Sequence, residues 1–468
     1  MGKLLEPADS ALRRKVDDLA GRYVRSTRNV GLAVGLLAGD ESLVLGYGKL
    51  ASEDDRTPDG HTVFEIGSVT KVFTAALLAE MGGRGEVAID QPVAELLPAG
   101  IRMPCRRGEP ITLAHLSEHT SALPRLPGNL WPTVTDQKNP YRDYQVSHLY
   151  EYLSKASVGF PPGTGAAYSN LGAGLLGHVL ALRARLPYDE LLAARILHPL
   201  GLMDTGVALS EDQASRLAPG HDAMGKPTSN WDLPTLAGAG ALRSTADEML
   251  SFLRANLDPP GTPAGAALRA CHAPRPVAWW RRVGVGIAQG LGLAAASLLV
   301  QWGVPLSPGR WTFLTALIVP VLVAEGWKGF WSGVWTALAV WAGTWLLWGS
   351  AFGWAPAGVA LLIALGVSGF ASGYLPPGVP VRLGWQEAEA GSGVLALWHN
   401  GGTGGYRSFV GFVPGSRVGV VVLSNSTHEV DTIGMGLLKD LHEASGSQNR
   451  GLNVAGRPED LAPQPGHS

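Results

Sequence analysis

The pattern of apolar and polar positions divides the chain into three pieces. Up to about Pro274, short β-rich runs and amphipathic helices alternate with loops rich in Gly and Pro. The stretch GLAVGLLAGDESLVLGYG predicts two strands around a Gly39-Asp40 turn. The same kind of pattern returns after Val381, where GVLALWHNGGTGGYRSFVGFVPGSRVGVVVLSNS contains three β-runs and a helix is predicted from about Asp431 to Ala444. The last twenty residues are polar and rich in Pro and Gly, which predicts a disordered tail.

The piece between these two parts is almost free of charge. Between Val283 and Pro380 there are three charged residues, and eleven of the fifteen tryptophans fall between Trp279 and Trp354. Three of its four apolar runs are long enough to cross a hydrocarbon layer, which needs about 20 helical residues. A core helix of a globular domain is rarely uncharged on every face over such a length. We therefore expect an all-α transmembrane insertion of about four spans at residues 276–381.

Three short motifs stand out, far apart in the sequence. Ser68-Val69-Thr70-Lys71 is the one S-x-x-K of the chain, and it opens a predicted helix. Tyr168-Ser169-Asn170 lies in a loop before a helix, and His399-Asn400-Gly401 ends a predicted strand. Ser68 has two possible roles. It is a good helix N-cap, or it is a nucleophile that Lys71, three residues on and on the same helix face, activates.

These motifs, in this order, resemble the serine β-lactamase and penicillin-recognising hydrolase superfamily, in its class C-like branch. The resemblance covers about residues 8–275 and 382–445. It is carried by FEIGSVTKVFTAALLA, ITLAHLSEHTSALP, PGTGAAYSN, LGLMDTG, GAGALRSTADEM and LWHNGGTGGYRSFVGFVP. Two departures are visible. Ala122 stands where the family usually has the glycine of H-T-S-G-L, and His399-Asn400-Gly401 stands where β-lactamases usually have K-T-G. The second departure favours the peptidase and esterase members.

The resemblance implies an α+β, β-lactamase/transpeptidase-like fold: an antiparallel sheet of N- and C-terminal strands, flanked by helices, with a helical lobe that carries Tyr168. It also implies roles for the motif residues. Ser68 is the acylated nucleophile, and its own backbone N–H is one of the oxyanion donors. Lys71 is the base or lowers the cost of proton transfer, and Tyr168 transfers a proton to the leaving group. Asn170 and His399 position the substrate or the catalytic groups, and Gly402 gives the second oxyanion N–H.

Other conspicuous residues are interpreted as structural. His119 and His178 are expected to pack rather than to bind a ligand. The Pro- and Asn-rich loop 124–146, with Trp131 and Tyr141, is expected either to line the pocket or to pack as a lid. Cys105 and Cys271 form no disulfide framework or metal spacing. No metal or organic cofactor is expected, and the absence of a basic tract argues against a nucleic-acid partner.

The insertion separates the second motif from the third, so an even number of crossings is needed to bring all three motifs to one pocket. Five cationic residues then lie on the catalytic side of the bilayer and Arg310 alone on the other. They are Arg275, Arg281, Arg282, Lys328 and Arg382. The positive-inside rule places the catalytic side in the cytoplasm. The N-terminus is too charged for a signal peptide, which agrees with that orientation.

The sequence thus predicts a multi-pass membrane serine hydrolase that acts on a small-molecule or short-peptide amide or ester. Residues 1–275 and 382–448 form the hydrolase domain, and residues 449–468 form the tail. Two other classes of protein stay open. One is a membrane sensor that is acylated by its ligand, and the other is a catalytically silent binding protein of the same fold.

Overall fold

The computed structural model describes residues 11–25, 29–275, 382–391 and 393–454. Its centre is a six-stranded sheet in the order β2-β1-β8-β7-β6-β5, in which every neighbouring pair is antiparallel. The strands are β1 (Gly31–Ala38), β2 (Glu41–Gly48), β5 (Gln386–Glu389), β6 (Leu395–Gly402), β7 (Arg407–Val413) and β8 (Val418–Ser424). β1 pairs with β8, so strands from both ends of the sequence form one sheet.

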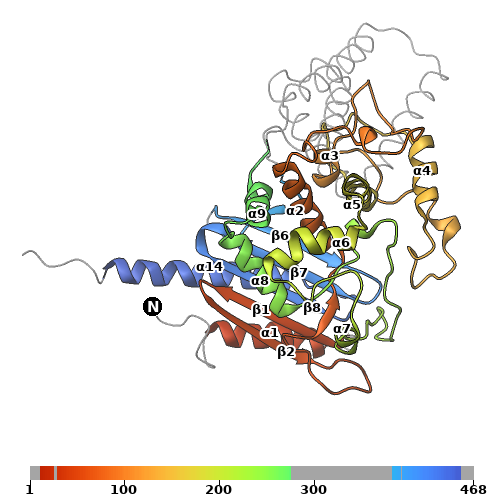
Figure 1. The fold of residues 1–468 in the computed structure, drawn as a ribbon. Coiled ribbons are helices and arrows are strands. Elements are labelled where there is room, and N and C mark those ends of the chain that lie inside the picture. Colours follow the sequence, from red (N-terminus) through yellow and green to blue (C-terminus); the bar gives the residue numbers. More distant parts are fainter. Residues whose placement is uncertain (1–10, 26–28, 276–381, 392, 455–468) are drawn as a thin grey trace, which may run out of the picture.

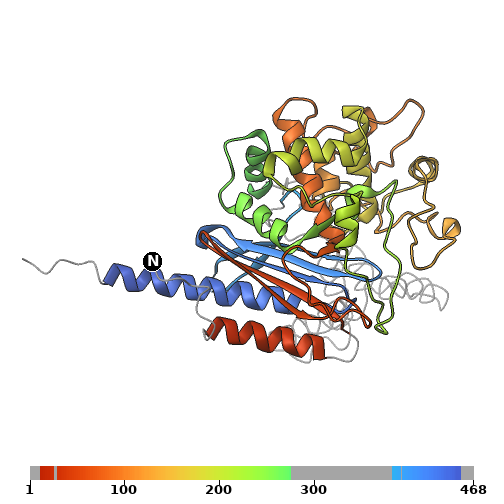
Figure 2. The same ribbon diagram turned by 60° about the horizontal axis from the view of Figure 1, so that its bottom comes forward.

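Helices cover both faces of this sheet, as Figure 2 shows most clearly. On one face lie α1 (Ala11–Arg25) and α14 (Asp431–Val454). On the other lie α2 (Thr70–Gly83), α8 (Ala246–Leu257) and α9 (Pro263–His272). The alternation of side chains along the strands explains this arrangement. In β6, Leu397 belongs to the core under α2 and α8, whereas the next-door Ala396 belongs to the core under α1 and α14.

A second, mostly helical lobe extends from the α2 side of the sheet (Figure 1). Its helices are α3 (Leu113–Ser117), α4 (Val146–Lys155), α5 (Asn170–Ala184) and α6 (Tyr188–Leu192). β3 (Val63–Glu65) and β4 (Arg243–Thr245) pair in a separate two-stranded ribbon, and the short helix α7 (Glu211–Ser215) lies between α6 and β4 in the sequence. The described residues also form short 3₁₀ or π turns: η1 (Gly67–Val69), η2 (Val93–Glu95), η3 (Trp131–Thr133), η4 (Ala193–Leu197), η5 (His198–Leu200), η6 (Ala237–Ala239) and η8 (Pro414–Ser416).

The structure confirms the predicted α+β architecture, including the hairpin around Gly39-Asp40 and the three strands after residue 394. One difference lies at the C-terminus. α14 continues to Val454, so residues 449–454, which were predicted to belong to the disordered tail, are helical. No proline interrupts the sequence between Asp431 and Val454, and an intact backbone donor at every position allows the helix to continue.

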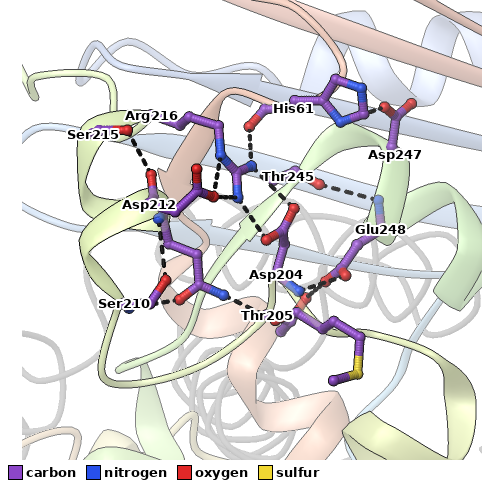
Figure 3. Close-up of polar contacts among 12 residues, drawn as sticks. His61, Asp204, Thr205, Ser210, Asp212, Ser215, Arg216, Thr245, Asp247 and Glu248 are labelled. Atoms are coloured by element: carbon purple, nitrogen blue, oxygen red, sulfur yellow. Dashed lines mark hydrogen bonds and ion pairs between the residues drawn. The ribbon is translucent and has the colours of Figure 1, made fainter.

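A polar cluster fixes the segment before α7 to the start of α8 (Figure 3). The guanidinium of Arg216 contacts Asp204 at 2.6 Å and Asp212 at 2.8 Å, and its Nη1 donates to the carbonyl of His61. Glu248 accepts from the backbone N–H of Asp204 at 2.6 Å. Four chain segments therefore meet through charge-assisted hydrogen bonds, which are stronger than neutral ones.

The two ends of the predicted insertion attach to the same turn of the helical lobe. Arg275 forms ion pairs with Glu118 and with Asp90, both at 2.6 Å. Gly384 donates its N–H to the carbonyl of Ser117 at 3.3 Å. Residues 276–381, with the four predicted spans, lie outside the described residues. Within the part of the chain that the structure does describe, no helix has both the length and the apolar character needed to cross a membrane.

Candidate active site

Ser68 lies in η1, the 3₁₀ turn that joins β3 to α2. Gly67 has a φ of +49°, in the left-handed region that a glycine adopts without steric cost. The N-cap residues of η1 and α2 are Ile66 and Val69, and neither helix start has a side-chain cap bond. Ser68 is therefore not the helix cap that one interpretation of the sequence proposed.

Lys71 lies one turn further on, with its ammonium nitrogen inside the protein. The side chain is 3 % exposed. Nζ lies 2.9 Å from Ser68 Oγ, 2.9 Å from Asn170 Oδ1 and 2.7 Å from the carbonyl oxygen of Ala239. Burial, helped by the charge of Arg125, holds the pKa of Lys71 well below its usual value. The neutral amine is thereby favoured.

The three partners of Lys71 assign its lone pair. The Asn170 amide oxygen and the Ala239 carbonyl oxygen only accept hydrogen bonds. The two N–H bonds of a neutral amine satisfy these two oxygens, and the lone pair then remains for the third partner, the Ser68 hydroxyl. This arrangement is the one that a general base for Ser68 requires.

Tyr168 is enclosed by basic and aromatic side chains. Lys71 Nζ lies 4.8 Å and the Arg125 guanidinium carbon 5.2 Å from the centre of the Tyr168 ring. The His119 ring lies 4.3 Å away, centre to centre. Burial raises the pKa of Tyr168 to about 12, although the Ser68 hydroxyl and the charge of Arg125 act in the opposite direction. At neutral pH the side chain is a phenol and holds a proton that it can donate.

His119, interpreted from the sequence as structural, positions the Tyr168 loop. Its Nδ1 accepts the N–H of Ser169 at 3.2 Å, and its carbonyl accepts the N–H of Ala167 at 2.8 Å. Both neighbours of Tyr168 are thus fixed by one residue. Burial keeps the pKa of His119 well below its usual value, so the ring is neutral and accepts at Nδ1. His178 packs as predicted and lies 2.8 Å from the Tyr150 hydroxyl through Nε2.

His399 lies on β6 and faces the same core as Lys71. It is 1 % exposed, and its ring centre lies 6.3 Å from that of Tyr168. Nδ1 lies 2.6 Å from the carbonyl of Asn400, which can only accept, so Nδ1 carries the proton and Nε2 is an acceptor. Burial lowers the pKa of His399 to about 3. Among the described residues, nothing donates to the buried Nε2.

The end of β6 lies directly against the Ser68 turn. A Cβ atom added to Gly67 would lie 2.6 Å from Gly402 N, and one added to Gly401 would lie 2.9 Å from Ser68 N. The Ser408 hydroxyl, on the neighbouring strand β7, donates to the carbonyl of Ile66 at 2.7 Å. The backbone N–H groups of Ser68 and Gly402, the predicted oxyanion donors, are therefore on adjacent segments.

A cavity of about 650 Å³ opens over these groups. Ser68, Tyr168, Asn170 and Gly402 contribute to its wall, and the loop after Pro124 supplies much of the rest. These loop residues are Arg125, Leu126, Leu130, Trp131, Gln137, Pro140 and Tyr141. Of the two expectations for the loop, the structure shows the pocket-lining one. A larger cavity of about 1110 Å³, beside α5 and α6, contains none of the motif side chains.

Two contributions to the site were not predicted from the sequence. The Ala239 carbonyl carries no side-chain signal, since any residue type can provide it. Arg125 is one arginine among many, and only the fold brings it to Tyr168. Within the described ranges, no group of three His, Cys, Asp or Glu side chains is close enough to share a metal ion.

Comparison with known proteins identifies the family. The sequence profile of the Beta-lactamase family matches residues 16–348 and 363–442. The chain belongs to the Beta-lactamase family. The D-alanyl-D-alanine-carboxypeptidase/endopeptidase AmpH of Escherichia coli is 33 % identical over 249 residues, which are 51 % of this chain and 60 % of AmpH. A Beta-lactamase of Pseudomonas fluorescens is 28 % identical over 267 residues, 56 % of this chain and 70 % of that protein. The matched part thus spans about 60 % of the length of AmpH.

Solved structures show the same fold. A Beta-lactamase/D-alanine carboxypeptidase from Yersinia pestis superposes with a TM-score of 0.60 at 19 % identity and covers 91 % of this chain and 97 % of that one. A class C beta-lactamase gives a TM-score of 0.61 at 18 % identity, with 94 % and 98 % covered. The family and fold implied by the three motifs are confirmed.

Proposed function

We propose that this member of the Beta-lactamase family is a serine hydrolase that transfers an acyl group from an amide or ester to Ser68 and then to water. The observation that carries the proposal is the 2.9 Å contact between Lys71 Nζ and Ser68 Oγ, with both other partners of Nζ being carbonyl-type oxygens. A buried, neutral lysine whose lone pair points to a serine hydroxyl is an activated nucleophile pair.

Acylation begins at this pair. Ser68 Oγ attacks the substrate carbonyl carbon while its proton passes to Lys71 Nζ. The carbonyl oxygen gains negative charge, and the N–H groups of Ser68 and Gly402 supply the oxyanion contacts. Removal of one such donor typically slows the acyl-transfer step by about 10²–10³-fold.

Collapse of the tetrahedral intermediate needs a proton on the leaving nitrogen or oxygen. The Tyr168 phenol gives it, and the resulting phenolate is stabilised by the adjacent Lys71 ammonium and by Arg125. Lys71 then returns the proton to Tyr168, which restores both groups. In deacylation a water molecule takes the place of the leaving group, and the same proton transfers run in reverse.

The substrate class follows from the family and from the site. AmpH, the relative described above, is named as a D-alanyl-D-alanine carboxypeptidase and endopeptidase. At the position where β-lactamases usually carry a lysine, this chain has His399, which is neutral because burial lowers its pKa to about 3. Loss of that cation supports a peptidase or esterase rather than an efficient β-lactamase.

The location of the enzyme is a separate proposal. The apolar sequence of residues 276–381 supports a membrane tether, and the catalytic side is proposed to face the cytoplasm because most of the nearby positive charges lie on that side. Protease treatment of sealed inside-out vesicles should then digest the hydrolase domain. Protection of that domain in such vesicles contradicts the orientation, and recovery of the full chain without membranes contradicts the tether.

Covalent labelling tests the catalytic proposal. Full-length protein is treated in parallel with a fluorescent penicillin and a fluorophosphonate, beside Ser68→Ala and Lys71→Ala variants. Labelling that disappears in Ser68→Ala is expected, and the preferred probe separates penicillin-recognising from esterase-type chemistry. A stable adduct without turnover would indicate the sensor instead. A folded protein that neither probe labels would mean that the site is catalytically silent.

A further inference from the structure

The turn that follows α3 supports the loop that carries Tyr168. His119, the second residue after α3, accepts the N–H of Ala167 through its carbonyl at 2.8 Å and the N–H of Ser169 through Nδ1 at 3.2 Å. These two donors are the chain neighbours of Tyr168. A displacement of the turn therefore displaces the backbone on both sides of the phenol.

α3 is too short to fix this turn by its own hydrogen bonds. It contains five residues, and isolated helices shorter than about 12–15 residues are only marginally stable in water. The turn also includes an unfavourable backbone conformation, because His119 has a φ of +57° and is not a glycine. Contacts from outside α3 must therefore hold the turn in place.

Glu118, directly before His119, makes one of these contacts. Its side chain is 7 % exposed and accepts from Arg275 Nε at 2.6 Å. Arg275 lies just beyond α9, which packs against α2, and its Nη2 donates to Asp90 at 2.6 Å. Burial raises the pKa of Glu118 to about 7, and the charge of Arg275 acts in the opposite direction. The arginine thus stabilises the ionised form of a buried carboxyl group at the turn.

Gly384 holds the same turn from another side. Its N–H donates to the carbonyl of Ser117 at 3.3 Å. Its φ is +72°, and an added Cβ would lie 2.6 Å from Ala75 Cβ and 3.0 Å from the carbonyl oxygen of Lys71. The next residue, Trp385, is buried. The turn after α3 is therefore fastened both to the end of α9 and to a segment that passes directly against α2 at Lys71.

We propose that Glu118 and Arg275 are positioning residues for Tyr168: their ion pair fixes the turn after α3, and His119 transmits this position to the phenol. The inference rests on the proposed function, because there Tyr168 protonates the leaving group. Neither side chain belongs to the described wall of the catalytic cavity, so neither contacts the substrate. A displacement of roughly 1 Å at a reacting group can slow a reaction about 100-fold.

Two esters with the same acyl group test this assignment: the ethyl and the 4-nitrophenyl ester of phenylacetylglycine. Nitrophenolate leaves without a proton, whereas ethoxide needs one from Tyr168. In Arg275→Gln, kcat/KM for the ethyl ester should fall about 10–100-fold more than kcat/KM for the nitrophenyl ester. Tyr168→Phe sets the full size of this selective loss, and Arg275→Lys should recover part of it.

A second variant tests the ion pair itself. Glu118→Gln should change the ratio of the two kcat/KM values in the same direction as Arg275→Gln. Because both residues act through one contact, the double variant should show a smaller change than the product of the two single ones. Changes that multiply in the double variant would mean that the two residues do not act as a pair, which overturns the proposal.

Arg195→Gln is the matched control. Like Arg275, Arg195 joins two carboxylates, Glu80 and Glu86, and the Glu80 side chain is fully buried. Arg195 lies in η4, and its loss should lower the melting temperature but leave the ratio of the two esters unchanged. An unchanged ratio in Arg275→Gln, or an equal loss on both esters, would mean that its ion pair only stabilises the fold.

Hydrogen exchange separates this proposal from a failure of the hydrolase assignment. The N–H groups of Ala167 and Ser169 are protected by His119, so a peptide that contains residues 163–171 reports the position of the loop by mass spectrometry. Their exchange should become at least about tenfold faster in Arg275→Gln and stay unchanged in Arg195→Gln. This result supports the positioning role even if the wild type hydrolyses neither ester. Equal exchange in the wild type and Arg275→Gln contradicts it.

Discussion

Lys71 Nζ lies 2.9 Å from Ser68 Oγ, and the two other atoms that it contacts are the Asn170 amide oxygen and the Ala239 carbonyl oxygen. Neither oxygen can donate a proton, so both compete for the N–H bonds of the amine and not for its lone pair. Burial holds the pKa of Lys71 well below its usual value, and in the neutral amine that this favours, the lone pair is left to accept the Ser68 hydroxyl.

Lys71→Met should therefore remove the base while retaining much of the side-chain volume. We expect the rate of Ser68 labelling by a fluorophosphonate to fall by about 10²–10⁴-fold, the usual range for a positioned general base. To measure this rate, labelling reactions are stopped at successive times and the labelled protein is quantified on gels. Ser68→Ala sets the background, and circular dichroism checks the fold. A Lys71→Met protein that labels at the wild-type rate would show that another group activates Ser68.

His399 should make the protein less stable in mild acid. Its pKa is about 3 in the folded state because of burial, against about 6.5 for an unfolded chain. Between these values the unfolded state binds more protons, so stability rises with pH and is lost as the pH falls below about 6.5. From pH 7 to pH 5 this one group accounts for a loss of roughly 2 kcal/mol, at 1.4 kcal/mol per unit.

Urea unfolding at pH 7 and at pH 5 measures this loss, with His399→Gln as the comparison. The variant cannot titrate at this position, so its stability should fall less between the two pH values than that of the wild type. Equal losses in both proteins would mean that His399 is protonated in the folded state as readily as in the unfolded one.

Ala122 stands where the family usually has a glycine, and this difference lowers the stability of the folded protein. Its φ is +61°, in the left-handed region, and it follows His119, whose φ is +57°. An L-residue in that conformation destabilises the folded state by about 1–2 kcal/mol relative to glycine. Replacement by glycine recovers only part of this free energy, because glycine also makes the unfolded chain more flexible and so stabilises the unfolded state. We expect Ala122→Gly to stabilise the protein by roughly 0.5–1 kcal/mol.

The same substitution elsewhere is the control. Ala266 is an exposed residue of α9, where glycine costs about 1 kcal/mol. The melting temperature should therefore rise for Ala122→Gly and fall for Ala266→Gly. A fall in both melting temperatures would show that packing of the Ala122 methyl group outweighs the backbone term.

Much of the site was predictable because each motif residue is tied to a local pattern. The i, i+3 spacing of Ser68 and Lys71 sets their contact, and the period of two along β6 sends His399 to the catalytic face. Arg125 and the Ala239 carbonyl were not predictable in this way. Their positions depend on how the loop after α3 and the turn η6 fold against α5 and α2, and no spacing in the sequence encodes that packing.

Gly401 tests whether the two oxyanion donors depend on a close backbone contact. A Cβ atom at this position would lie 1.9 Å from the carbonyl oxygen of Ile66 and 2.9 Å from the backbone nitrogen of Ser68. Backbone atoms at such distances cannot adjust by a side-chain rotation, so Gly401→Ala must separate the end of β6 from η1. The N–H groups of Ser68 and Gly402 would then no longer converge on one oxygen atom.

We expect Gly401→Ala to lower the rate of Ser68 acylation at least about 100-fold, as loss of an oxyanion donor does. The matched control is Gly415→Ala, because Gly415 lies in the β7–β8 turn and an added Cβ there has no neighbour within 4 Å. Labelling rates and circular dichroism are compared for both variants. If Gly401→Ala is folded and labels as fast as Gly415→Ala, the oxyanion is bound elsewhere, and the assignment of Gly402 has to be abandoned.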